Sequence, residues 1–156
     1  MIKKPLDIVL FKGIGLEPFL CKYFKRELFL KIRKKERSIK DILLDQNFIC
    51  GIGNIYANEI LFRSKISPFK LGKRLNEEDF NKLLNSVEYI LKVAIKKGGS
   101  SIKDYKNTNA KLGYFQTVFK VYNKKGLACY KCEDLILKSK QSGRSTYYCK
   151  TCQIVN

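Results

Sequence analysis

Four of the six cysteines lie in the last 28 residues of the chain, as two pairs with the same spacing. Cys129 and Cys132 form one Cys-x2-Cys pair, Cys149 and Cys152 form the other, and 16 residues separate the two pairs. Such pairs place four thiolates on two short turns, which suits a tetrahedral Zn²⁺ with Zn–S bonds of about 2.3 Å. Two disulfides or unrelated buried thiols are the alternative, but disulfides are rare in reducing compartments. We therefore predict one zinc ion with a closed coordination sphere, which folds the segment and activates no water.

A second pattern, Gly51-Ile52-Gly53-Asn54, is typical of a tight turn that leads into a helix. Glycines let backbone N–H groups face a ligand, and the N-terminus of a helix carries a partial positive charge, so the turn could bind a phosphate. We expect Asn54 to cap the helix and to donate an amide N–H to a phosphate oxygen. The spacing alone is a weak signal, and an ordinary helix-turn-helix corner is the simpler explanation of it.

The overall charge indicates a polyanionic partner. The 156 residues include 32 Lys and Arg but 14 Asp and Glu, a formal charge of +18, which a zinc ion with four thiolates would reduce to about +16. The chain contains no histidine, which excludes Ser/His/Asp and Cys/His nucleophiles and histidine-ligated metal sites. We find neither a run of roughly 18 uncharged apolar residues nor a cleavable leader. We therefore expect no membrane partner and a location in the cytoplasm or on the nucleoid.

The elements that must position these residues are mainly helical. Apolar residues at helical spacing predict a first helix over Pro18–Lys35. The segment Lys22–Lys40 carries nine Lys and Arg but two Glu, a basic run of the kind that is usually a solvated face. Cys21 and Cys50 lie apart from the two pairs, and we expect them to be small buried residues rather than metal ligands.

Two further helices flank the glycine turn. Ser38 followed by Asp41 is a capping-box-like start for a helix that buries apolar side chains and ends at Gly51. Asn54 starts the next helix, which Pro68 ends. The two helices are therefore expected to be joined by a very tight Gly-Ile-Gly turn.

The last predicted helix covers Asn76–Lys97. Asn76 caps it, and Gly98 and Gly99 end it. Its apolar residues recur at helical spacing, and we expect them to form core without a functional role: Phe80, Leu83, Leu84, Val87, Leu91, Ala94 and Ile95. After Gln116 the pattern changes to short strands around the cysteines. The predicted fold class is therefore mostly α with a small β zinc-finger hairpin.

Three parts of the chain resemble the formamidopyrimidine-DNA glycosylase and endonuclease VIII family, in order and with compatible spacing. Leu43–Gln46 and Gly51–Ala57 with Glu59 resemble the helix-two-turn-helix motif of that family. The other two parts resemble the loop over the extruded base in the formamidopyrimidine branch and the end of the family's zinc finger: Gly98–Tyr105, Gly113–Gln116 and Val121–Tyr122 for the loop, and Gly143–Cys149 with Cys152 and Gln153 for the finger. The resemblance implies a DNA-binding helix-two-turn-helix domain over residues 17–115 and a four-cysteine zinc finger over residues 116–156.

The resemblance also implies DNA-binding roles for single residues. Asn54, in the turn with Gly51 and Gly53, would bind a phosphate beside the lesion. Arg144, at the tip of the finger hairpin, would bind another phosphate, which agrees with the planar fork that an arginine presents. Without the resemblance, a solvated hairpin residue is the better explanation of Arg144.

The same resemblance places Lys103 and Tyr105 in the loop that would cover a flipped base, although core packing is the alternative for the tyrosine. This loop is more similar to the formamidopyrimidine branch than to endonuclease VIII, which implies oxidised purines as the damage removed. The implied function is the DNA-binding portion of a base-excision-repair DNA glycosylase and abasic-site lyase. Its implied partner is damaged double-stranded DNA.

The catalytic end of the family has no counterpart in this sequence. Family members begin with a mature N-terminal proline, whose amine attacks the damaged nucleotide, followed by a glutamate, whereas Pro5 here is internal and no glutamate follows it. We therefore expect residues 1–16 to be the remnant of an absent N-terminal domain and its linker. We assign no catalytic residue and expect the chain to be inactive alone, with a separately encoded catalytic half as a further partner.

Two other interpretations come from different classes of protein. A stand-alone, non-catalytic, zinc-dependent nucleic-acid-binding protein would bind abasic DNA without reacting with it. A zinc-ribbon protein of ribosomes or transcription would explain the charge and the cysteines. It would explain neither the Gly51–Asn54 turn nor the Gly98–Gln116 segment.

Overall fold

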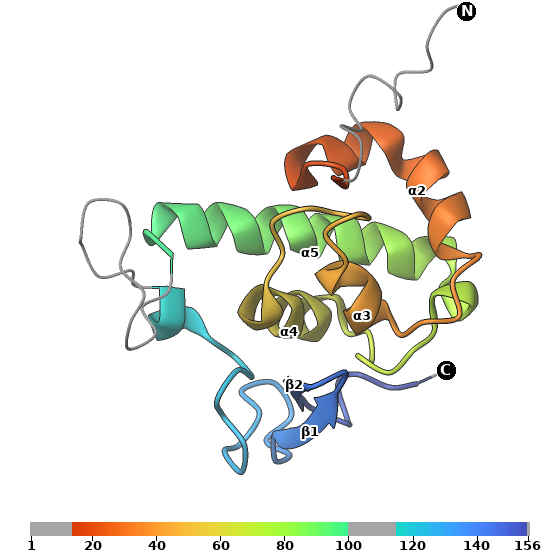
Figure 1. The fold of residues 1–156 in the computed structure, drawn as a ribbon. Helices are drawn as coiled ribbons and strands as arrows, with labels where there is room; N and C mark the ends of the chain where they lie inside the picture. The colour runs from red at the N-terminus through yellow and green to blue at the C-terminus, as the bar shows by residue number, and fades with distance from the viewer. Residues whose placement is uncertain (1–13, 100–114, 156) are drawn as a thin grey trace, which may run out of the picture.

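Figure 1 shows the computed structural model of the chain, which describes residues 14–99 and 115–155. Its α-helices, 3-10 helices (η) and strands are, in chain order, η1 Pro18–Phe24, α2 Lys25–Ile32, α3 Ile39–Leu44, α4 Asn54–Ser64, η2 Gly72–Arg74, α5 Glu77–Lys96, η3 Phe115–Val118, β1 Leu137–Gln141 and β2 Arg144–Tyr148. The long helix α5 crosses the molecule, and α4 lies between α5 and the β1–β2 hairpin. This mostly helical fold with a two-stranded hairpin and four clustered cysteines confirms the predicted class.

Among the described residues, no helix combines the length and the apolar character that a bilayer span requires.

Helix α5 forms where its caps and its apolar spacing predict it. The Asn76 side chain accepts a hydrogen bond from the Asp79 N–H at 2.7 Å, and Gly98 and Gly99 end the helix with positive φ angles of 74° and 80°. Six of the seven predicted core positions are buried. Ile95 is the exception, with 68% of its surface exposed, because it lies one residue beyond the buried stripe that ends at Ala94.

The first predicted helix is only half α-helical. Pro18–Phe24 form a 3-10 helix, and the α-helix begins at Lys25. The 3-10 segment has three residues per turn, so its two buried residues, Pro18 and Cys21, share one face. The Glu17 carboxylate starts this segment by accepting the Phe19 N–H at 3.0 Å. The buried residues are therefore three positions apart in this segment, and the 3.6-residue period of an α-helix begins only at Lys25.

The connection between α3 and α4 is longer than predicted. Ser38 caps α3 by accepting the Asp41 N–H at 3.1 Å, as expected, but the helix ends at Leu44 and not at Gly51. Residues 45–53 form a loop that the Gln46 side chain closes, because its carbonyl accepts the Gly51 N–H at 2.7 Å and its amide donates to the Ile52 carbonyl at 3.1 Å. The expected tight Gly-Ile-Gly turn is therefore the last part of a longer loop.

Helix α4 begins at Asn54 and ends at Ser64, before the predicted stop at Pro68. Lys65 adopts a left-handed conformation with φ 60°, which ends the helix. The following residue, Ile66, is buried, and its N–H bonds back to the Leu61 carbonyl at 3.1 Å. The chain therefore leaves the helix early so that Ile66 can enter the core.

Within residues 14–99 and 115–155, two clusters of buried side chains hold the fold together. The larger one joins η1 with α2, α3, α4 and α5. The smaller one consists of five residues of the cysteine-rich segment and one residue of α4: Val121, Cys129, Ile136, Tyr147 and Cys149, with Phe62. Because Phe62 belongs to α4, the cysteine-rich segment shares its small core with the helical part.

Candidate nucleic-acid interface and metal centre

The four paired cysteines converge as their spacing predicts. Their Sγ atoms all lie within 4.8 Å of one another, with 3.9 Å between Cys129 and Cys152 and 3.4 Å between Cys132 and Cys149. A tetrahedral ion with metal–sulfur bonds of about 2.3 Å sets its ligands about 3.8 Å apart, so the donors fit such an ion. All four thiols are free of disulfides, which argues against the disulfide alternative. The cluster could therefore hold one metal ion with four sulfur ligands.

The two remaining cysteines take no part in this cluster. Cys21 is buried, as predicted, and burial raises the pKa of its thiol to about 12. Cys50 is only half-buried in the loop between α3 and α4, so the prediction of a buried residue is wrong there. The loop folds back through the side chain of Gln46, which leaves Cys50 near the surface.

The hairpin that carries the second cysteine pair is short and regular. β1 and β2 are antiparallel, with Gln141 opposite Arg144. The two turn residues between them, Ser142 and Gly143, both have positive φ angles, 48° and 78°, as a two-residue type I′ turn requires. Arg144 is therefore the first residue of β2, and its side chain is exposed.

The glycine turn leaves open space in front of the N-terminus of α4. Gly51 and Gly53 are exposed, and a Cβ added at either would meet no atom within 4 Å. Gly51 has a φ angle of 82°, which favours glycine. The first N–H groups of a helix have no partner inside it, so this end presents donors and a partial positive charge to that space.

Asn54 does not cap α4, contrary to the prediction. The N-cap is Gly53, and Asn54 is the first helical residue. Its side-chain amide instead donates to the Ser145 carbonyl at 3.0 Å. An amide has two N–H donors, so one of them is left for a further acceptor such as a phosphate oxygen. Because Ser145 follows Arg144 directly, the structure brings Asn54 and Arg144 to one side of the molecule.

A buried lysine fixes the hairpin against the helices. Lys40, on α3, is fully buried, and its Nζ donates to the Ser145 carbonyl at 2.9 Å and to Thr146 Oγ1 at 2.7 Å. Burial lowers the pKa of its amine, Asp41 opposes this shift and the charge of Arg144 adds to it, so that the pKa falls from 10.5 to about 8. The prediction that the basic run is a solvated face is therefore wrong at Lys40. Helical spacing carried a signal, since Lys40 lies beside the buried Leu43.

Two further side chains of α4 bind backbone groups of the finger. Asn58 accepts the Tyr147 N–H at 2.7 Å. Glu59 is buried, and its carboxylate accepts three consecutive N–H groups at 2.9 to 3.0 Å, from Lys120, Val121 and Tyr122. Burial raises the pKa of Glu59 although these N–H groups act in the other direction. The helical part and the finger are therefore joined by buried polar contacts that sequence reasoning missed.

The Lys40 contacts predict a pH-dependent stability. In zinc-loaded protein, Lys40→Met should lower the free energy of unfolding by about 1 kcal/mol at pH 7, since hydrogen bonds to two acceptors are lost. The pKa of Lys40 is lower in the folded chain, about 8, than its ordinary 10.5, so the unfolded chain holds more protons between these values. This residue therefore stabilises the fold increasingly as pH rises through that window, and the deficit of the variant should grow by about 1.4 kcal/mol per pH unit.

Urea unfolding at pH 7.0 and pH 9.5 measures this difference. Lys34→Met, at an exposed position of the same basic segment, is the matched control and should show no pH-dependent deficit. A deficit of Lys40→Met that stays constant or shrinks at the higher pH would contradict a buried, depressed-pKa lysine.

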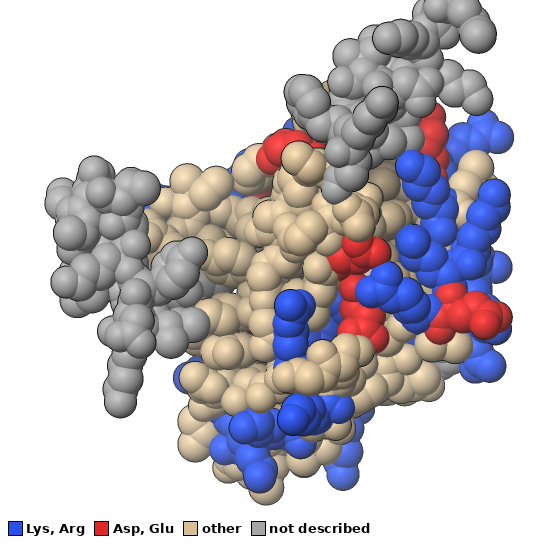
Figure 2. All heavy atoms as spheres, viewed as in Figure 1, with Lys and Arg blue, Asp and Glu red and all other residues tan. Residues whose placement is uncertain are grey.

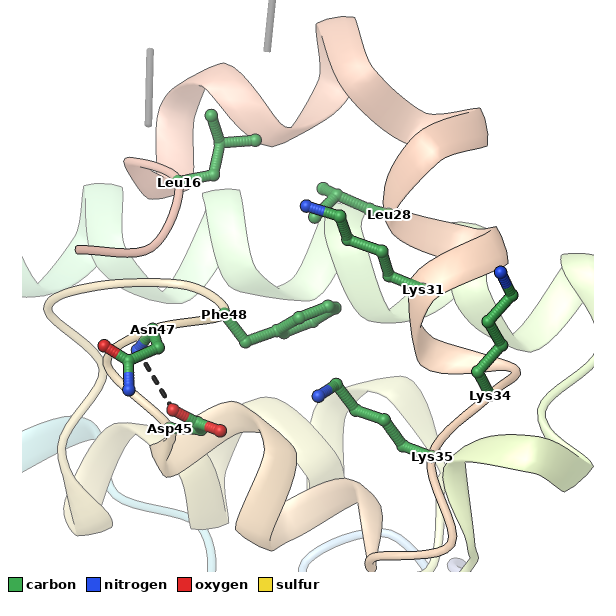
Figure 3. A pocket seen from close by; sticks show the side chains of 8 residues that line it. All are labelled: Leu16, Leu28, Lys31, Lys34, Lys35, Asp45, Asn47 and Phe48. Carbon is green, nitrogen blue, oxygen red and sulfur yellow. Dashed lines mark hydrogen bonds between the residues drawn. The ribbon is translucent and has the colours of Figure 1, made fainter. Parts of the chain in front are cut away.

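Other basic side chains gather on the face that Figure 2 shows, over α2 and over the hairpin. Beside α2, three lysines, two acceptor-bearing residues and three apolar ones line a hollow of about 370 Å³: Lys31, Lys34, Lys35, Asp45, Asn47, Leu16, Leu28 and Phe48. In Figure 3, Lys31 and Lys35 extend toward Phe48, and the Asp45 carboxylate accepts the Asn47 N–H at 3.0 Å. Three lysines of the basic run, Lys31, Lys34 and Lys35, thus line a concave surface, whereas Lys40 is buried.

Lys103 and Tyr105 lie outside the described residues.

Comparison with known proteins points to one group. Residues 14–106 match the family model described as the formamidopyrimidine-DNA glycosylase H2TH domain. A curated relative, formamidopyrimidine-DNA glycosylase of Rickettsia massiliae (strain Mtu5), is 40% identical over 148 residues, which are 95% of this chain and 53% of that protein. The chain therefore spans about half the length of the curated relatives it matches.

Two solved structures also match this chain over nearly its whole length. The crystal structure of the MutM (Fpg) protein from Thermus thermophilus matches with a TM-score of 0.86 and 35% identity, over 96% of this chain and 57% of that one. The Lactococcus lactis Fpg in complex with abasic-site DNA matches with a TM-score of 0.84 and 39% identity, over 96% of this chain and 55% of that one.

Proposed function

Because the chain belongs to the formamidopyrimidine-DNA glycosylase family, we propose that it binds damaged duplex DNA by gripping the sugar-phosphate backbone. The observation that carries this proposal is the hydrogen bond from Asn54, at the open N-terminus of α4, to the carbonyl of Ser145, which directly follows the exposed Arg144. An amide donor, a guanidinium and the N–H groups at the start of a helix all suit phosphate oxygens. The net charge of +18 adds a sequence-independent attraction to nucleic acid.

The metal of the proposed site is zinc. Four cysteine thiolates are soft ligands that select Zn²⁺ among the common divalent ions, and their tetrahedral spacing agrees with it. With four protein ligands the ion would have no open position for water or substrate, so its role is structural. It would hold Cys129–Cys132 and Cys149–Cys152 together and thereby keep Arg144 at its place on β2.

The finer function that we propose is a part in base-excision repair of oxidised purines. A similar Lactococcus lactis Fpg structure contains Fapy-dG DNA, and a similar MutM structure contains carbocyclic 8-oxo-G DNA. In this chain the duplex grip would hold the strand on either side of such a lesion. The glycosylase and abasic-site lyase chemistry would come from the half of the relatives that this chain does not match. That catalytic half would lie on the same polypeptide or on another one.

A second candidate is a stand-alone binder of damaged DNA without catalysis, for which the Asn54 contact beside Arg144 and the four-cysteine cluster would suffice. Sodium borohydride trapping, combined with fluorescence anisotropy, tests whether the chain reacts with abasic DNA or only binds it. The 156-residue chain should bind an abasic duplex more tightly than the matched intact duplex and form no covalent adduct with it. An adduct would show that the chain itself carries a reactive amine, and equal affinity for intact RNA and abasic DNA would contradict the duplex-repair proposal.

A further inference from the structure

We propose that the chain has a second nucleic-acid site, for unpaired DNA, in a cleft remote from the duplex grip. The cleft has a volume of about 350 Å³ and lies where the C-terminal half of α4, the middle of α5 and the first cysteine turn meet. Aromatic and cationic side chains dominate its lining: Phe62, Arg63, Tyr89, Lys120, Tyr130 and Lys131. This inference goes beyond the proposed duplex binding and does not depend on Asn54 or Arg144.

The two tyrosines of the cleft offer ring faces to a ligand. Tyr130, between Cys129 and Cys132, is 60% exposed, and Tyr89 on α5 is 48% exposed. Phe62 lies behind Tyr130 with a centroid separation of 5.8 Å, and it is buried, so it fixes the inner side of that ring. Unpaired bases stack on such exposed rings regardless of sequence, because every base has a π-face.

Three cations surround these rings. The Arg63 guanidinium lies 3.5 Å from the centroid of Tyr89, and Lys120 Nζ lies 4.5 Å from that of Tyr130. Lys131 Nζ lies 5.9 Å from the Tyr130 centroid and 5.8 Å from that of Phe62. Phosphates on either side of a stacked base would therefore meet positive charge.

Among the described residues that line the cleft, no exposed carboxylate opposes this charge. Glu59 is the one acid that lines the cleft there, and it is 2% exposed. Its two oxygens already accept the N–H groups of Lys120, Val121 and Tyr122. Both oxygens of this carboxylate are thus occupied by backbone N–H groups of the finger, and the charged side chains that face the cleft opening are cations.

The position of the cleft separates it from the duplex grip. Arg63 follows Asn54 by nine residues on the same helix, which corresponds to about 13 Å along its axis. A paired duplex hides its base faces in the stack, whereas an unpaired strand can lay bases against Tyr89 and Tyr130. The ring pair and its three cations therefore fit single-stranded DNA better than a second stretch of duplex.

The test uses the zinc-loaded chain and a fluorescein-labelled ten-nucleotide oligothymidylate at low salt. Tyr89→Ala with Tyr130→Ala should weaken binding at least about tenfold, because stacking on two rings is lost. The conservative Tyr89→Phe and Tyr130→Phe changes keep the rings and should retain the affinity. Tyr23→Ala removes a tyrosine that is 71% exposed outside the cleft, and it is the matched control.

Two further probes make the outcome specific to this site. An oligomer of abasic residues, with phosphates but without bases, should bind the unchanged chain much more weakly than the oligothymidylate does. The Asn54→Ala, Arg144→Ala variant should bind the oligothymidylate normally, so a failure of the duplex proposal would not affect this result. Circular dichroism and zinc content establish that the tyrosine variants are folded.

Three results would overturn the inference. Unchanged oligothymidylate binding in the double alanine variant would show that the strand does not use the rings. Equal binding of the abasic oligomer would show that phosphates alone are recognised. Displacement of the oligothymidylate by an acidic aromatic peptide, together with tighter binding of that peptide, would show that the cleft is a protein-docking surface.

Discussion

Replacing Cys149 with serine is expected to release the metal, unfold the finger and weaken binding to an abasic duplex by at least about 100-fold. The core of the finger is small, since among the described residues it consists of six buried side chains, two of which are Cys129 and Cys149 themselves. A two-stranded hairpin is marginally stable on its own, whereas structural zinc supplies about 10–16 kcal/mol in finger peptides. Once the hairpin unfolds, Arg144 is no longer held beside Asn54.

The helical part should survive this change, because its own core cluster contains no cysteine-pair residue. Far-ultraviolet circular dichroism should therefore retain most of the helical signal, while zinc content falls to zero and anisotropy shows the loss of DNA binding. Cys50→Ser is the matched control, since this half-buried thiol lies outside the cluster, and it should keep both zinc and affinity. A Cys149→Ser protein that binds abasic DNA normally would show that the finger takes no part in the grip.

The cysteine cluster and α5 were predictable because their determinants are local. Cys-x2-Cys spacing specifies a metal turn by itself, and the side chain of Asn76 caps a helix whose amphipathic stripe reads directly from the sequence. The hairpin turn is similar, since Gly143 supplies a positive φ that two-residue turns need. Each of these features depends on residues within a few positions of one another.

The contacts that join the helices to the finger were not predictable because their partners are distant in sequence. Lys40 is 105 residues from Ser145, and its helical spacing beside Leu43 indicates burial but does not identify that partner. Glu59 was recognised only as part of a family motif, and its task of accepting backbone N–H groups became visible when residues 120–122 were placed against α4. The partner of Asn54 is likewise distant in sequence, because its amide donates to the Ser145 carbonyl and does not cap its own helix.

The cleft between α4, α5 and the first cysteine turn was not predicted either, because its residues also come from distant parts of the sequence. Tyr89 lies on a helix whose pattern accounts for its buried stripe, and Tyr130 lies inside a metal turn, so each is unremarkable alone. Only the packing of the finger against α4 and α5 brings the two rings to one hollow. A single sequence does not record which surfaces meet when modules pack.

Asn54→Ala combined with Arg144→Ala is expected to weaken binding to an abasic duplex by about 100-fold while the zinc content stays unchanged. Removal of a charge-assisted bond from Arg144 to phosphate costs about 1.5–3 kcal/mol, and loss of the Asn54 amide bond costs about 1 kcal/mol. Arg144 is exposed, so its replacement disturbs no packing, whereas Asn54 also loses its bond to Ser145, a small structural cost. The slope of log affinity against log salt should fall in magnitude by about 0.9, because one phosphate contact from a cation is gone.

The salt slope is what separates a specific grip from diffuse charge. Asn81→Ala with Lys82→Ala removes one amide and one cation from exposed positions on α5, and this matched control should leave both affinity and preference for abasic DNA intact. Arg144→Lys keeps the charge but loses the planar fork, so it should restore the slope and only part of the affinity. If the Asn54 and Arg144 double variant loses no more affinity than the control pair, the net charge of +18 alone holds the DNA, and the proposed grip beside α4 is wrong.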